Sequence, residues 1–152
     1  MADLIPPHGG DTLQPLYVDD PDVRSTLEAE AIDLPALTIS SAAAANAVML
    51  AGGYFTPLTG FMDKADALSV AATMHTSRGL FWPTPVLNLV GSTDGIGAGD
   101  RIALRDPNVA GQPVIAIQNV SAVEELSDAE TAAIIQQTYG TTDPEHPGVA
   151  EF

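Results

Sequence analysis

Cysteine is absent from the 152-residue chain. Without it there is no disulfide framework, no thiolate nucleophile and no zinc site built on sulfur ligands. The sequence therefore excludes the classes of protein whose fold or chemistry depends on thiols.

Basic residues are scarce. The chain has 20 Asp and Glu residues against five basic ones, which gives a formal net charge of −15. The basic residues are Arg24, Lys64, Arg78, Arg101 and Arg105. Because nucleic acids and anionic membranes bind clustered Lys and Arg, we expect neither as a partner. The acids are spread along the chain, as is typical of a solvated acidic surface.

Long hydrophobic runs are missing as well. No segment approaches the roughly 18 consecutive apolar residues of a membrane-spanning helix. The first ten residues, MADLIPPHGG, lack the basic and apolar stretches of an export signal, so we expect a cytoplasmic protein. What the chain does have is a hydrophobic fraction of 45%, which predicts one folded domain with a packed core.

Two helices are predicted in the first third of the chain. Residues 19–33 begin with aspartates and Pro21, and they place apolar residues four positions apart on one face. Residues 41–53 combine a capping serine with strong helix formers and a glycine pair that ends the helix. The low polarity of this second helix predicts that it is buried.

Two further helices are predicted from their capping residues. Asp63 is expected to cap a helix that runs to about His75. Ser127 and Glu130 have the spacing of a capping box, in which each side chain bonds the other's free backbone amide. Gly140 is expected to end that last helix.

The strands are predicted from alternating apolar residues, and they cover residues 37–40, 79–90, 101–106 and 114–126. Pro83 and Pro85 cannot donate to a sheet, so the strand at 79–90 is expected at an edge or a barrel corner, with residues 86–90 paired normally. Residues 54–63 show neither helical nor strand periodicity and are predicted to be an irregular loop that fills the core. Helices followed by strands indicate an α+β domain with a small barrel.

No catalytic, cofactor-binding or metal-binding residue is predicted. His8, His75 and His146 are far apart and form no H-x-x-H or H-x-x-x-H pair. The glycine-rich stretch at residues 94–100 leads into a strand instead of a helix, so it is predicted to be a turn and not a dinucleotide loop. A nucleophile elbow and a phosphate-binding lysine loop are both missing.

The closing stretch GTTDPEHPGVAEF, residues 140–152, gathers acids, a histidine and prolines. Pro144, Pro147 and Gly148 are turn residues. We interpret Asp143, Glu145 and His146 as turn formers, and we expect the stretch to lead the chain out of the domain.

One long segment resembles a known family. Residues 34–62, LPALTISSAAAANAVMLAGGYFTPLTGFM, resemble the N-terminal domain of ATP sulfurylase (sulfate adenylyltransferase). The chain also resembles the family's other motifs, which occur in the family's order. They are HGG at 8–10, before this segment, and WPTPV at 82–86, GDRIALRDP at 99–107 and YGTTDPEHPGV at 139–149, after it. The resemblance implies a PUA-like fold, which is a mixed β pseudobarrel with flanking helices.

The resemblance also implies that catalysis takes place in a second domain. In the family this domain precedes a catalytic domain that transfers the adenylyl group of ATP to sulfate. That second domain carries a Gln-x-Arg-Asn-Pro segment, a His-x-x-His pair and a Gly-Arg-Asp segment, and this sequence has none of the three. We therefore expect residues 1–139 to form a non-catalytic accessory domain without a cofactor, and residues 140–152 to lead toward a catalytic domain outside this sequence.

Other functions remain open from the sequence. The chain is alternatively a free-standing PUA-like binding or regulatory module that lost the catalytic half, or a complete small enzyme. Its partner would be the catalytic domain or another protein subunit, and a homo-oligomer is a further alternative. RNA binding, which other PUA-like domains perform, is opposed by the net charge of −15.

Overall fold

The computed structural model describes residues 5–150 and 152, which form four helices and three strands. The elements in chain order are α1 (Pro21–Asp33), β1 (Ala36–Thr38), α2 (Ser41–Ala51), α3 (Lys64–Thr73), β2 (Arg101–Arg105), β3 (Val114–Asn119) and α4 (Asp128–Tyr139). The described chain is thus an α+β fold.

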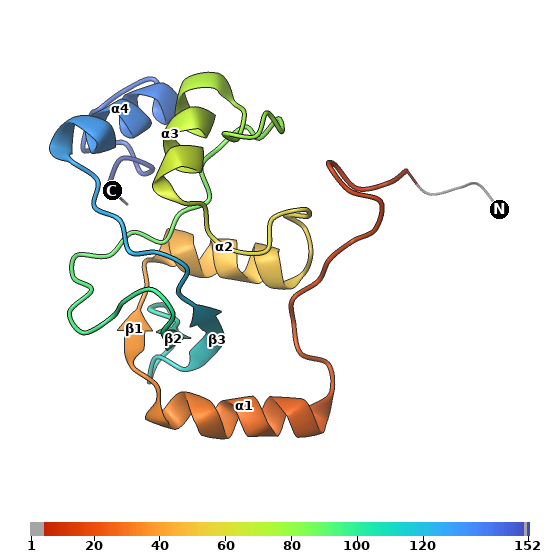
Figure 1. Cartoon of the computed structure of the whole chain (residues 1–152). Coiled ribbons are helices and arrows are strands. Elements are labelled where there is room, and N and C mark those ends of the chain that lie inside the picture. The colour runs from red at the N-terminus through yellow and green to blue at the C-terminus, as the bar shows by residue number, and fades with distance from the viewer. Residues whose placement is uncertain (1–4, 151) are drawn as a thin grey trace.

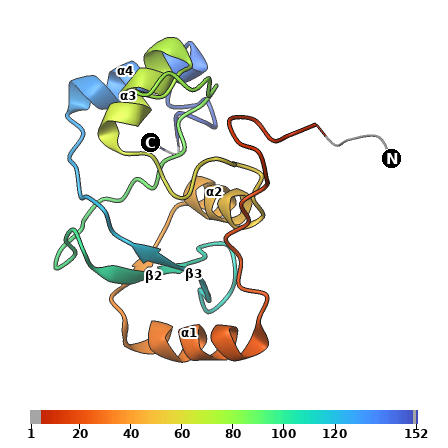
Figure 2. The same ribbon diagram turned by 45° about the vertical axis from the view of Figure 1, so that its right-hand side comes forward.

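The small sheet lies between two helices (Figures 1 and 2). Helix α1 covers one side of the sheet and α2 lies on the other, while α3 and α4 pack against each other beyond α2. The N-terminal segment before α1 runs along the side of the molecule, past one end of α2.

The sheet is mixed and has the order β1-β2-β3. Strand β1 pairs in parallel with β2, and β2 pairs antiparallel with β3. In the central strand Ile102, Ala103 and Leu104 are all buried. The sequence predicted alternation of apolar and polar residues in this strand, but the helices on both sides bury both of its faces.

The core consists of two clusters. One lies between the sheet and α2 and contains Ile39, Ala43, Ala44, Ile102, Leu104 and Val120. The other, around Leu50, Val70, Trp82 and Val86, lies between α2, α3 and the irregular segments. Phe61 packs against both clusters. The predicted role of residues 54–63 as an irregular loop that fills the core is therefore confirmed.

The predicted helices are confirmed, with small differences at their ends. Asp20, Asp63 and Ser127 cap α1, α3 and α4, and Ser127 and Glu130 form the predicted capping box. Helix α2 is capped by Ser40 instead of Ser41, because the side chain of Ser40 accepts from Ala43 N. Helix α3 ends at Thr73, before His75, since Met74 adopts a left-handed conformation.

Helix α2 was predicted to be buried, and this is wrong for one of its faces. Val48 and Met49 are exposed, and only Ala43, Ala44 and Leu50 are fully buried. The helix lies between the sheet and α3, so its apolar composition serves two contacts and still leaves apolar side chains at the surface.

The prediction of a strand at residues 79–90 is also wrong. This segment bends at Gly79 and at Pro83 and Thr84, and its backbone forms only an isolated bridge between His75 and Phe81 and single bonds such as Met62 N to Val86 O at 2.8 Å. Pro83 and Pro85 remove two donors, which interrupts any ladder. The strand predicted at 114–126 ends at Asn119. The described residues form a three-stranded sheet, and the closed pseudobarrel stays a prediction.

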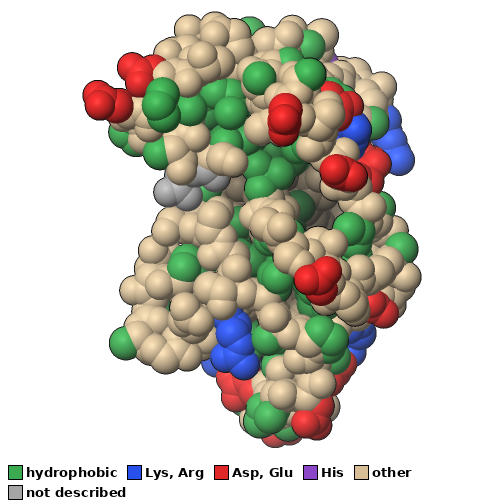
Figure 3. Space-filling model, turned by 90° about the vertical axis from the view of Figure 1, so that its left-hand side faces the viewer, with side chains coloured by type: hydrophobic (Ala, Val, Ile, Leu, Met, Phe, Trp, Pro, Cys, Tyr) green, Lys and Arg blue, Asp and Glu red, His purple; other side chains and the backbone are tan. Residues whose placement is uncertain are grey.

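The described helices include none that is both long and apolar enough to cross a bilayer. Acidic side chains are scattered over the face shown in Figure 3 and do not form one continuous patch. Several acidic side chains of the described chain cap helices, for example Asp20, whose carboxylate accepts from Asp22 N and Val23 N.

Candidate functional site

An open groove of about 540 Å³ lies on the surface of the described residues. Three segments that are far apart in the sequence line it, and we call it the aromatic groove. Its lining residues are His8, Asn46, Tyr54, Phe55 and residues 81–86. The motifs HGG, YFTPLTGFM and WPTPV each contribute to this lining.

The N-terminal segment is held beside the groove by backbone contacts. Gln14 N donates to Thr56 Oγ1 at 3.0 Å, and Leu16 N donates to Ala51 O at 2.9 Å. Gly53 has a φ of +75°, and a Cβ at this position would lie 3.0 Å from Pro15 N. Gly53, the second glycine of the pair that follows α2, therefore permits the close approach of the segment that carries His8.

The aromatic rings of the groove are packed edge to face. Trp82 is only 8% exposed and meets Phe55 in a T-shaped contact with ring centroids 5.6 Å apart. The Phe81 ring contacts two histidine rings edge to face, with centroids 6.2 Å from His8 and 5.6 Å from His75. Such contacts add to the stability that burial of the rings supplies.

Two rings at the groove remain accessible to solvent. Tyr54 is 74% exposed and Phe81 is 49% exposed. The groove lining includes no Asp, Glu, Lys or Arg, in a chain whose net charge is −15. Exposed aromatic side chains in an uncharged concave surface are typical of binding sites.

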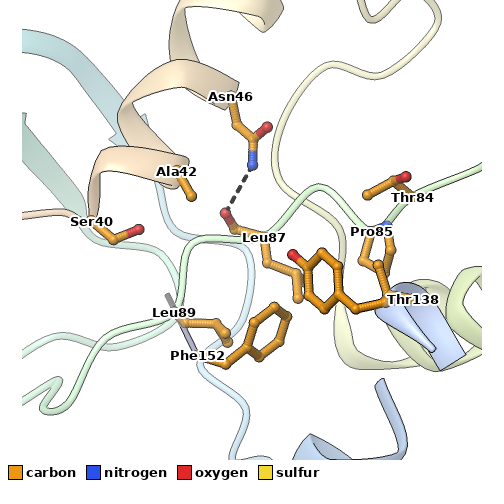
Figure 4. A pocket seen from close by; sticks show the side chains of 10 residues that line it. Ser40, Ala42, Asn46, Thr84, Pro85, Leu87, Leu89, Thr138 and Phe152 are labelled. Carbon is orange, nitrogen blue, oxygen red and sulfur yellow. Dashed lines mark hydrogen bonds between the residues drawn. The ribbon is translucent and has the colours of Figure 1, made fainter. Parts of the chain in front are cut away.

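A smaller cavity of about 150 Å³ adjoins the groove and shares Asn46, Thr84 and Pro85 with it. Figure 4 shows Phe152 and Leu89 at this cavity, and Asn46 Nδ2 donating to Leu87 O at 3.4 Å. Thr138 Oγ1 is buried at the cavity without a hydrogen-bond partner in the described chain.

Each of the three histidines has a ring nitrogen within hydrogen-bond distance of a backbone group. His8 Nε2 lies 2.7 Å from Phe81 O, and His75 Nδ1 lies 2.7 Å from Thr73 O. His146 Nδ1 accepts from Gly148 N at 3.2 Å, and its ring contacts that of Tyr139 at an interplanar angle of 43°. The fold brings His8 and His75 into contact with one phenyl ring, that of Phe81, but His146 lies apart on the 140–152 segment against α4.

Metal-ligating side chains do not gather anywhere in residues 5–150 and 152, where no group of three His, Asp or Glu could hold an ion. In the closing stretch Asp143 accepts from Glu145 N at 2.9 Å, which is a turn contact. In the glycine-rich stretch Gly97 N donates to Asp100 Oδ2 at 2.7 Å and the chain enters β2, so the predicted turn is confirmed.

One carboxyl group has a strongly shifted pKa, and it lies outside the groove. A hydrogen bond from Lys64, followed by bonds from the backbone and hydroxyl of Ser127, lowers the pKa of Glu130 to about 2. Because Glu130 is the partner of the cap at the start of α4, this shift reflects a structural contact.

Sequence reasoning missed the aromatic groove as a site. Each segment was noticed, but His8, Tyr54 and Trp82 are separated by 46 and 28 positions and share no spacing. One feature of the sequence could have indicated the groove, namely the large aromatic side chains in segments with neither helical nor strand periodicity.

Comparisons with known proteins agree with this fold. The family model described as PUA-like domain matches residues 5–152. Sulfate adenylyltransferase from Alcanivorax borkumensis is 57% identical over 152 residues, which is 100% of this chain and 38% of the relative. The enzyme of the same name from Allochromatium vinosum is 53% identical over 149 residues, or 98% of this chain and 38% of the relative.

Among solved structures, the hexameric APS kinase from Thiobacillus denitrificans matches with a TM-score of 0.66 and 33% identity over 82% of this chain and 24% of the other. The chain thus spans 38% of the length of the curated relatives named above. The resemblance to sulfate adenylyltransferases that was inferred from the motifs is confirmed. The family model covers nearly every residue, and the chain belongs to the family of PUA-like domains.

Proposed function

We propose that the chain is the N-terminal accessory domain of a sulfate adenylyltransferase and carries no catalytic residue of its own. The observation that supports this is the match to sulfate adenylyltransferases over the full chain but only 38% of their length. The motifs that the family's catalytic domain carries are not in the sequence.

The reaction of the family requires cationic side chains around the substrates, and neither concave surface of this chain has them. In adenylyl transfer a sulfate oxygen forms a bond to the α-phosphorus of ATP, and the bond to pyrophosphate breaks. Such a step needs converging cationic groups that stabilise the charge on phosphate and sulfate. Neither the groove nor the adjoining cavity is lined by Lys or Arg.

Four of the five basic side chains are engaged by the chain itself. Arg24 donates to Val18 O, Arg105 donates to Gln112 O, Arg101 pairs with Glu30, and Lys64 pairs with Glu130. These cations are dispersed over separate elements and serve the fold. This arrangement supports the proposal that the chain is an accessory domain and that the active site lies elsewhere in a longer chain.

The division of the chain is part of the same proposal. Residues 1–139 would be the accessory domain and residues 140–152 the segment that leads to the catalytic domain. Within this segment the His146 and Phe152 rings lie 5.3 and 6.2 Å from the Tyr139 ring, so it runs against α4 before it continues. The pseudobarrel, the cytoplasmic location and the role in sulfur metabolism belong to this proposal too.

Two activity measurements test the proposed function. The purified chain is mixed with ATP and sulfate, or with molybdate as a substitute, and pyrophosphate release is followed. We expect no turnover. In the second measurement the chain replaces the matching segment of the Alcanivorax borkumensis enzyme, and we expect ATP-dependent pyrophosphate release. Clear turnover by the chain alone would contradict the accessory role.

A free-standing binding module is the second candidate, and the exposed aromatic groove is the observation that favours it. In this case the chain itself recognises a separate protein. A pull-down from native extract with the purified chain checks this idea, and recovery of the chain alone would count against it.

A further inference from the structure

We infer that the aromatic groove is the surface on which the rest of a sulfate adenylyltransferase chain packs. This inference rests on the proposed function and deepens it, because it names the interface between the accessory domain and the part that follows it. The occupant is an uncharged, apolar surface of that following part.

The first argument is where the described chain ends. Phe152 lies at the small cavity, which shares Asn46, Thr84 and Pro85 with the groove (Figure 4). The relatives continue well beyond the matched region, since the chain spans 38% of their length. In such a chain the residues after the position of Phe152 emerge directly beside the groove.

The second argument is the exposed apolar surface around the groove. Tyr54 and Phe81 are exposed at the groove itself, and Val48 and Met49 are exposed on α2. The ring of Tyr54 lies close to Gly52, so this exposed ring joins the groove to the end of α2. Apolar surface gathered in this way gains free energy when a second apolar surface covers it.

The third argument is charge. No carboxylate and no Lys or Arg lines the groove, whereas carboxylates are spread over the rest of the chain. A second copy of the chain would bring another net charge of −15 toward this one and is disfavoured at low ionic strength. A free nucleotide or sulfate finds no cation here, so the groove fits an uncharged protein surface instead.

The absence of cysteine permits a direct test with single-cysteine variants. Tyr54→Cys and Phe81→Cys report on the groove. Val109→Cys is the matched control, because Val109 is 48% exposed on the turn between β2 and β3 and does not line the groove. Each variant is prepared as the isolated chain and as part of the longer enzyme, in which the chain replaces the matching segment of the Alcanivorax borkumensis protein.

The measurement is the rate at which each introduced thiol reacts with a maleimide, followed by mass spectrometry of the modified peptide. In the longer enzyme we expect positions 54 and 81 to react at least about tenfold more slowly than in the isolated chain, because labelling then requires the interface to open. Position 109 should react at the same rate in both forms.

The outcomes separate this inference from the proposed function. Equal rates at positions 54 and 81 in a longer enzyme that releases pyrophosphate would overturn the inference and leave the proposed function standing. A longer enzyme without the introduced cysteines that releases no pyrophosphate would count against both. Slow labelling of the isolated chain that increases with dilution would show that a second copy covers the groove, and it would also overturn the inference.

Discussion

The Nζ atom of Lys64 lies 2.7 Å from the Oε1 atom of Glu130. This contact joins the first residue of α3 to the first turn of α4, and Lys64 Nζ also donates to Glu125 O at 2.9 Å. Lys64 is the only lysine of the chain. One cation therefore connects the two helices that pack together beyond α2, and it lowers the pKa of Glu130.

Replacement of Glu130 by Gln is expected to reduce the sensitivity of the fold to acid. The pKa of Glu130 is lowered from 4.5 to about 2 in the folded chain, chiefly by the hydrogen bond from Lys64. Its stabilising contribution is thus fully present above about pH 4.5 and is lost as the pH falls toward 2. Thermal unfolding at pH 6 and pH 3 measures this effect.

The melting temperature of Glu130→Gln should fall less between these pH values than that of the parent chain. Glu28→Gln, on the exposed surface of α1, is the control and should behave like the parent. An equal fall for the parent and Glu130→Gln would contradict the assignment of this acid sensitivity to Glu130.

A matched pair of glycine substitutions tests the docking of the N-terminal segment. Gly53 and Gly140 both have a positive φ, and alanine in this conformation costs about 1–2 kcal/mol. A Cβ at Gly53 would in addition meet the backbone of Pro15, whereas the space around Gly140 is open. We expect Gly53→Ala to lose more stability in urea denaturation than Gly140→Ala, and equal losses would contradict this packing.

Truncation of core side chains tests how much the two hydrophobic clusters contribute to the stability of the fold. Leu104 is fully buried in the central strand, so Leu104→Ala should cost about 2–5 kcal/mol. Phe61 bridges both clusters but is only partly buried, so Phe61→Ala should cost about 3 kcal/mol, at the lower end for a core phenylalanine. A loss below about 1 kcal/mol for Phe61→Ala in chemical denaturation would show that the ring is not a core residue.

Removal of the capping box of α4 should destabilise the fold less than truncation of a core side chain. Ser127 Oγ accepts from Glu130 N, and Glu130 Oε2 accepts from Ser127 N at 2.8 Å. Ser127→Ala should destabilise the chain by about 1 kcal/mol. Ser121→Ala, at an exposed position outside the helices and strands, serves as the control and should leave the unfolding midpoint unchanged.

Local signals explain which elements could be predicted from the sequence. Caps such as Asp63 and Ser127 act on backbone amides two or three residues away, so the helices were recognisable from short patterns. The segment at 79–90 has the composition of a strand, but a strand also requires a neighbour with free donors and acceptors. The backbone segments beside it are irregular, and Met62 and Met74 provide only single backbone bonds.

The groove could not be predicted for a related reason. His8 reaches it because Gln14 and Leu16 dock on the end of α2, and Tyr54 reaches it because the chain turns at Gly53. None of these contacts leaves a periodic pattern.

Trp82 is the only tryptophan of the chain, and it lies in the wall of the aromatic groove against Phe55. Excitation at long ultraviolet wavelengths therefore selects one indole in the whole molecule. Its emission maximum and its quenching by acrylamide report on the polarity and accessibility of the groove alone. The chain thus carries its own optical reporter, with which a bound partner can be detected without any label.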